Sequence, residues 1–124
     1  MESILNSVKK MLDTGDGCEY FDHDIITHIN SVFMDLTQRL GVGPSEGFVI
    51  ADENDVWADF LPDTSQAKLE GVKSYMVLRV RLLFDPPSSS AHLASYERQI
   101  EKMEWVLTTI ADGISKESEE IQNG

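Results

Sequence analysis

The sequence predicts a small all-α protein: a bundle of about four helices with a long central loop and a flexible C-terminal tail. Apolar residues recur at spacings of three and four in four separate segments, which is the periodicity of amphipathic helices. Clusters of Gly, Pro, Asp and Ser separate these segments and favour turns between them. The 124 residues, 41% of them hydrophobic, are enough for one domain with one core.

We expect the first helix over residues 3–12 and the second from Asp22 to Leu40. Residues 13–17 (DTGDG) interrupt the apolar stripe of the first helix, because Gly and Asp favour turns. Asp22 is placed as the N-cap of the second helix. Gly41 is placed to end it in a left-handed conformation.

Residues 42–63 form an unusually long connection between helices. Phe48, Val49 and Ile50 are candidates for a short strand, and residues 55–61 for one or two amphipathic helical turns. The connection either packs over the core or, because long ordered loops often carry recognition residues, contacts a partner.

The third helix is expected over residues 64–84 and should be central, since its last half is apolar nearly all round. Arg79 and Arg81 interrupt this apolar zone. Each therefore has to pair with a carboxylate, reach water or lie at a subunit interface. The helix should end at residues 85–87 (DPP).

The last helix should begin at one of the serines 88–90, which act as an N-cap, and end at Gly113. We expect a helical domain over residues 1–113 and an acidic, disordered tail over residues 114–124. The apolar seam of the helix has the 3–4 spacing of a coiled coil, but it is too short for one and predicts packing within the domain. The seam consists of Leu93, Tyr96, Ile100, Met103, Leu107 and Ile110.

The formal net charge of −12 argues against a protein that grips duplex DNA, which needs clustered Lys and Arg. Residues 1–60 hold twelve acidic residues, whereas basic residues dominate residues 64–84. The two regions either pair within one fold or join the acidic face of one subunit to the basic face of the next. The candidate subunit-interface residues are Lys73, Arg79, Arg81, Asp22 and Asp24.

No pattern in the sequence predicts catalysis, a cofactor or a metal site. Asp24 and His28 share a helical face but lack the further ligands that a structural metal site needs. The serines 88–90 near His92 have no nucleophile elbow, and acidic neighbours make Cys18 less reactive. A lone cysteine fits an intracellular setting, and no apolar run is long enough to span a membrane.

Several stretches, in this order and spacing, resemble the small head–tail connector proteins of long-tailed phages. The resemblance covers about residues 2–110 and departs from the family in the turn at residues 13–20 and beyond Gly113. The stretches are residues 21–26 (FDHDII), 28–30 (HIN), 41–44 (GVGP), 57–61 (WADFL), 72–75 (VKSY), 80–87 (VRLLFDPP), 97–100 (ERQI) and 104–105 (EW).

The resemblance implies a helical subunit of a ring of about a dozen copies, a closed assembly that needs two different faces on each subunit. Such a ring docks under the portal protein at the head–tail junction of the virion, after assembly in the host cytoplasm. It offers a platform to a neck, stopper or tail-completion protein, while double-stranded DNA passes without specific binding. The candidate docking residues for these partners are Phe48, Val49, Ile50, Ile114, Glu117, Glu119, Glu120 and Ile121.

The strong negative charge leaves one alternative open, a small acidic regulatory protein or DNA mimic that binds a host protein. Such a protein would act in the cell and be absent from purified virions.

Overall fold

A computed structural model describes residues 2–12, 20–62 and 66–123 of the chain, with side chains as far as Thr109. The described part is all-α, as predicted, and its only β feature is an isolated bridge between Ser3 and Val56. The elements are α1 (Ile4–Leu12), α2 (Asp22–Met34), the π-helical turn η1 (Asp35–Arg39), α3 (Trp57–Phe60), α4 (Gln66–Phe84) and α5 (Ser90–Asn123).

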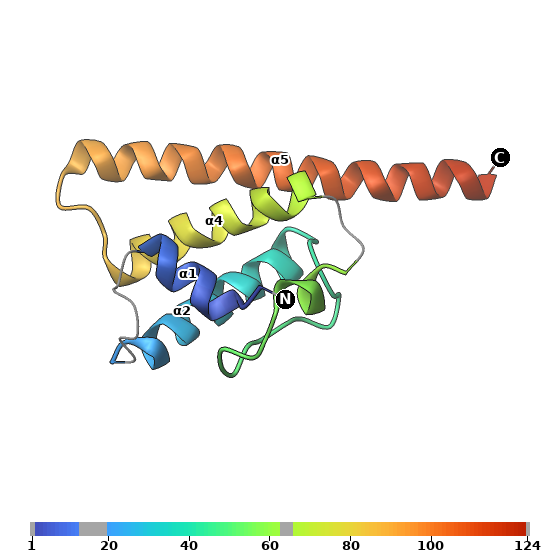
Figure 1. The fold of residues 1–124 in the computed structure, drawn as a ribbon. Coiled ribbons are helices and arrows are strands. Elements are labelled where there is room, and N and C mark those ends of the chain that lie inside the picture. The colour runs from blue at the N-terminus through green and yellow to red at the C-terminus, as the bar shows by residue number, and fades with distance from the viewer. Residues whose placement is uncertain (1, 13–19, 63–65, 124) are drawn as a thin grey trace.

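Helix α4 lies in the middle of the bundle (Figure 1). It packs against α1 and α2 on one side and against α5 on the other, which confirms that it is central. The C-terminal part of α5 extends beyond the other helices (Figure 1). No helix among the described residues is both long enough and apolar enough to cross a membrane.

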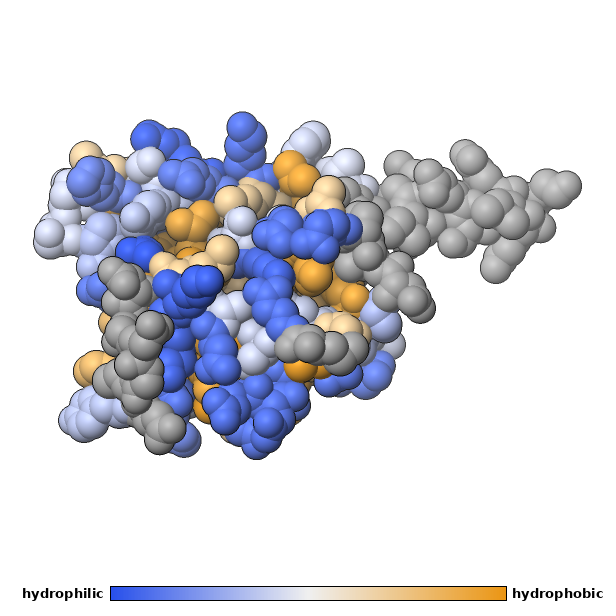
Figure 2. Space-filling model, viewed as in Figure 1, coloured by the Kyte–Doolittle hydropathy of each residue, from blue (hydrophilic) through white to orange (hydrophobic). Residues whose placement is uncertain are grey.

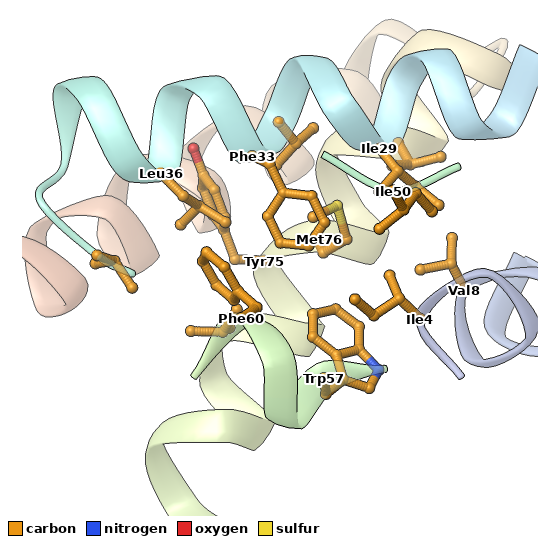
Figure 3. Packing of buried hydrophobic residues seen from close by; sticks show 14 of the residues in the cluster. Ile4, Val8, Ile29, Phe33, Leu36, Ile50, Trp57, Phe60, Tyr75 and Met76 are labelled. Atoms are coloured by element: carbon orange, nitrogen blue, oxygen red, sulfur yellow. The ribbon is translucent and has the colours of Figure 1, made fainter. Parts of the chain in front are cut away.

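The core is built around aromatic side chains from α2, α3 and the connection before α3 (Figure 3). Phe33 is fully buried, and its ring centroid lies 4.5 Å from that of Phe60, 5.0 Å from that of Phe48 and 6.1 Å from that of Trp57. The indole Nε1 of Trp57 donates a hydrogen bond of 2.9 Å to Ser7 in α1. The central connection is therefore part of the core.

The start of α2 differs from the prediction. Phe21 occupies the N-cap position, and no side chain caps the helix. Asp22 is the first helical residue instead, and its carboxylate lies 2.8 Å from the ammonium group of Lys9 in α1. The capping prediction was wrong because a cation from another helix binds the carboxylate.

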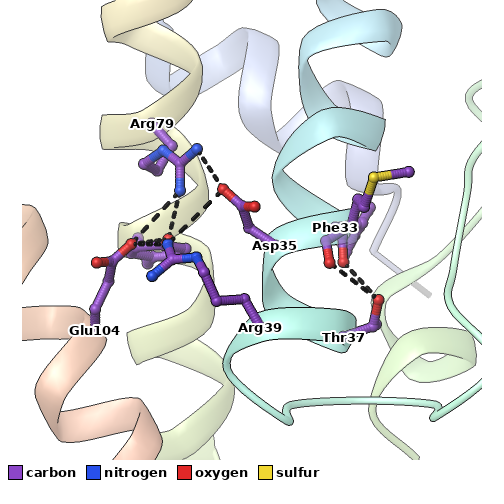
Figure 4. Close-up of polar contacts among 8 residues, drawn as sticks. Phe33, Asp35, Thr37, Arg39, Arg79 and Glu104 are labelled. Carbon is purple, nitrogen blue, oxygen red and sulfur yellow. Dashed lines mark hydrogen bonds and ion pairs between the residues drawn. The ribbon is translucent and has the colours of Figure 1, made fainter.

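The end of the second helix is as expected, but the path to it includes a π-helical turn. The N–H of Leu40 donates to the carbonyl oxygen of Asp35 at 3.0 Å, a spacing of five residues. Near this change of register, the hydroxyl of Thr37 donates to the carbonyl oxygen of Phe33 at 2.9 Å (Figure 4). Gly41 follows with a φ of 72°, which confirms the left-handed stop.

Residues 48–50 do not form the strand that we expected. Their backbone is fixed by a side chain, because the amide of Asn30 exchanges two hydrogen bonds with the backbone of Ile50, at 3.0 and 2.7 Å. This local pairing replaces a strand partner. The helical turn expected within residues 55–61 is confirmed by α3.

Helix α5 begins as predicted, with the hydroxyl of Ser89 accepting a hydrogen bond of 3.5 Å from the N–H of His92. Ile100 and Leu107 of the predicted seam are buried. The predicted end at Gly113 was wrong, since α5 continues to Asn123. One glycine costs a helix about 1 kcal/mol relative to alanine, which good helix formers on both sides offset. The division into a domain over residues 1–113 and a disordered tail stays a prediction.

Candidate functional site: the α4–α5 face

An ion-pair network joins η1, α4 and α5 (Figure 4). Arg79 of α4 donates hydrogen bonds to Asp35 at 2.7 Å and to the hydroxyl of Tyr75 at 2.5 Å. Tyr75 in turn donates to Glu104 of α5 at 2.6 Å, and Arg39 lies 2.5 Å from the same carboxylate oxygen. Two arginines balance two carboxylates, so the network closes around Tyr75 without net charge.

The network shifts the pKa values of its members. Burial raises the pKa of Tyr75 to about 12, and the hydrogen bond to Glu104 acts in the same direction. Burial would also raise the pKa of Glu104, but hydrogen bonds from Arg39 and Tyr75 outweigh it and hold that pKa below its usual value. Neutral Tyr75 and ionised Glu104 are therefore the stable forms around neutral pH. Through these ion pairs and hydrogen bonds, the network fixes α5 to the rest of the bundle.

Beside this ion-pair network, a groove runs between α4 and α5. Its volume is about 320 Å³. Gly71 is part of its lining, and an added Cβ at this glycine would meet no atom within 4 Å. Val106 and the adjacent Trp105 are 41% and 69% exposed. Figure 2 shows apolar residues reaching the surface on the face that carries α4 and α5. The residues that line this α4–α5 groove are Gly71, Gln99, Lys102, Met103, Val106 and Leu107.

A second uncovered surface lies on the connection before α3. Val49 is 71% exposed and the neighbouring Met34 of α2 is 66% exposed, and both line a hollow of about 550 Å³. We call residues 46–59 the acidic loop, because they contain five acidic residues and no Lys or Arg. Its acidic residues are Glu46, Asp52, Glu53, Asp55 and Asp59.

The structure places three of the predicted interface residues in ion pairs within the chain. Arg79 belongs to the network, Lys73 is buried and pairs with Glu2, and Asp22 pairs with Lys9. For Lys73, the pairing with Glu2 outweighs the effect of burial and raises its pKa.

The other two predicted interface residues lie nearer the surface. Arg81 donates a hydrogen bond of 3.2 Å to the carbonyl oxygen of Met11, and Asp24 is exposed. The structure does not bring the five residues into one patch. Their role between subunits stays a prediction.

The predicted docking residues in the loop have different environments. Val49 is open to solvent, whereas Ile50 is 3% exposed and Phe48 packs edge-on against Phe33. Val49 and part of Phe48 line the open hollow and are available to a partner, whereas Ile50 is not. The remaining docking residues lie beyond the described side chains: Ile114, Glu117, Glu119, Glu120 and Ile121.

Pairing with a carboxylate was one of the three possibilities that the sequence left open for Arg79. No pattern in the sequence pointed to the other members of the network: Asp35, Arg39, Tyr75 and Glu104. Asp35 and Glu104 lie 44 and 25 residues from Arg79 in the chain, so no local spacing connects them. Among the described side chains, no group of three or more His, Cys, Asp or Glu residues is placed to hold a metal ion.

The buried core, the ion-pair network that holds α5 and the two uncovered surfaces define a small helical domain suited to association with other proteins. A family model described as "Phage connector protein" matches residues 4–113. The chain belongs to this family, which confirms the resemblance and gives the chain a structural role of the phage connector type. No curated protein and no solved structure matches it.

Proposed function

We propose that the chain is a subunit of a connector ring that docks under the portal protein at the head–tail junction of a phage. The observation that carries this proposal is the family match over residues 4–113, which includes every core residue that the structure describes. In this role the ring extends the DNA channel and presents a platform to neck or tail proteins. The subunits assemble in the host cytoplasm and remain in the virion.

The charge of the chain supports a channel through which DNA slides. Its net charge of −12 disfavours tight phosphate binding, which requires clustered cations. DNA therefore passes a ring of such subunits without being held.

The shape of α5 supports docking to a second protein. Residues 110–123 continue the helix beyond the bundle, where Figure 1 shows that no other helix covers them. Since about ten residues of helix extend roughly 15 Å, this segment reaches a partner that the body of the domain does not touch. We assign portal docking to residues 114–124.

Removal of residues 114–124 is expected to abolish binding to the portal protein while leaving the melting temperature nearly unchanged, because every core residue among the described side chains precedes this segment. The measurement is co-sedimentation of purified chain with portal, for the full chain and the truncated one. Full binding by the truncated chain would reject the assignment to this segment. Failure of the full chain to bind the portal would reject the connector proposal itself.

A further inference from the structure

We infer that the α4–α5 groove of one copy receives the acidic loop of the next copy, which gives the ring its head-to-tail contact. This inference rests on the proposed ring and names the two surfaces that join its subunits. The groove is lined by Gly71, Met103 and Val106, and the loop presents Val49.

Two basic side chains at the groove have no partner among the described residues of the same chain. Lys102 lies at the groove, and Arg98 lies one helical turn before it on α5. Both side chains are exposed, and neither forms an ion pair or hydrogen bond with another residue that the structure describes. An apolar groove with a basic rim fits an apolar segment flanked by carboxylates.

The acidic loop has that composition. Val49 is its exposed apolar residue, and Glu46 and Glu53 are exposed on either side of it in the sequence. Within the described part of the chain, neither glutamate forms an ion pair or hydrogen bond. The loop is also held in one conformation, because Asn30 binds the backbone of Ile50. A fixed loop loses little conformational freedom on binding.

The two surfaces lie on different sides of the molecule. The acidic loop is attached to α1 and α2, through Trp57 to Ser7 and through Ile50 to Asn30. The groove lies between α4 and α5, on the other side of α4 (Figure 1). A contact between two different surfaces of the same chain is heterologous, and its repetition closes a ring where the rotation between neighbouring copies divides a full turn. Trp105, beside the groove, is the type of residue that dominates interface energies.

Gly71→Leu tests the groove directly. An added Cβ at Gly71 meets no atom within 4 Å, so a side chain can start there without a clash, and a leucine reaches into the groove and also favours the helix. We expect an unchanged or higher melting temperature and a dissociation constant between copies raised by at least about tenfold, the loss of one well-placed contact. Gly71→Ala is the matched control, since a single methyl group leaves most of the groove open. The readout is native mass over a range of concentrations, alone and with portal.

Charge reversal tests the partner. Arg98→Glu with Lys102→Glu should weaken assembly, and Glu46→Lys with Glu53→Lys should weaken it similarly, because each leaves like charges facing each other. One chain carrying all four changes should assemble again. Loss without such rescue would overturn the pairing of these two surfaces.

A mixing experiment tests the head-to-tail arrangement. A Gly71→Leu chain keeps its loop, and the Glu46→Lys, Glu53→Lys chain keeps its groove. At a concentration where the weakened contact leaves each variant alone monomeric, their mixture should form a 1:1 dimer and nothing larger. Larger rings from Gly71→Leu alone would overturn the inference while leaving the connector role intact. Loss of portal binding by Gly71→Leu with self-assembly retained would show that the groove receives the portal instead. A wild-type chain that stays monomeric both alone and with portal would contradict the ring itself.

Discussion

Gly43→Ala is expected to lower the free energy of unfolding by about 3 kcal/mol, through strain in the left-handed region and overpacking of the core. Gly43 has a φ of 89°, and a Cβ at this position would overlap with the ring of Phe60. Phe60 is 1% exposed and packs against Phe33, so its ring cannot move without disturbing the centre of the core. Urea unfolding followed by circular dichroism measures the loss.

Gly41→Ala is the control for this prediction. Gly41 also has a positive φ, 72°, but an added Cβ there meets no atom within 4 Å. Its substitution should therefore cost only the strain of the backbone, about 1 kcal/mol. Equal losses in the two variants would contradict the close packing of the connection against Phe60.

Glu104→Ala is expected to lower the free energy of unfolding by about 2 kcal/mol, because it leaves partly buried cationic and hydroxyl groups without their acceptor. Arg39 and Tyr75 both donate to this carboxylate, and Arg79 lies 3.6 Å from it. Glu101→Ala is the matched control, since Glu101 lies one turn earlier on α5 and is exposed. Comparable losses from both substitutions would contradict the role of the network.

The pH dependence gives the same variant a second readout. The lowered pKa of Glu104 contributes stability that is present above the pKa of an unfolded glutamate and is lost as the pH falls through the lowered value. The pKa of Tyr75, raised to about 12, contributes stability that is present below the ordinary tyrosine pKa near 10 and is lost as the pH rises toward 12. Glu104→Ala should reduce both losses. An unchanged pH profile of stability in this variant would contradict the coupling of Glu104 to Tyr75.

The helices were predictable because their information is local. The stripe of α1, the left-handed stop at Gly41 and the apolar seam of α5 each depend on residues within a few turns, and the structure confirms them. The central position of α4 was predictable for the same reason, since its last half is apolar on most sides. Periodicity and turn chemistry were therefore sufficient to predict the fold class.

The errors arose where a distant residue decides the outcome. Lys9 removed Asp22 from its expected capping role. Asn30 replaced the strand partner of residues 48–50 by binding the backbone of Ile50. The π-helical turn η1 has no periodic signal that distinguishes it from the end of an α-helix.

The candidate site was less predictable than the fold. For Arg79 the sequence left a carboxylate partner, water and a subunit interface all open. Asp35 and Glu104 are brought to it only by the packing of α2 and α5 on α4. The α4–α5 groove depends on the absence of a side chain at Gly71. The sequence around a glycine in a helix does not show whether a neighbouring helix packs over it or leaves it open.

Native mass spectrometry with negative-stain imaging, on the chain alone and with portal, decides whether the chain forms a ring. We expect one large species of uniform mass, a closed ring of about a dozen copies, that forms either spontaneously or on the portal. A chain of 13.9 kDa that remains a monomer under both conditions would contradict it.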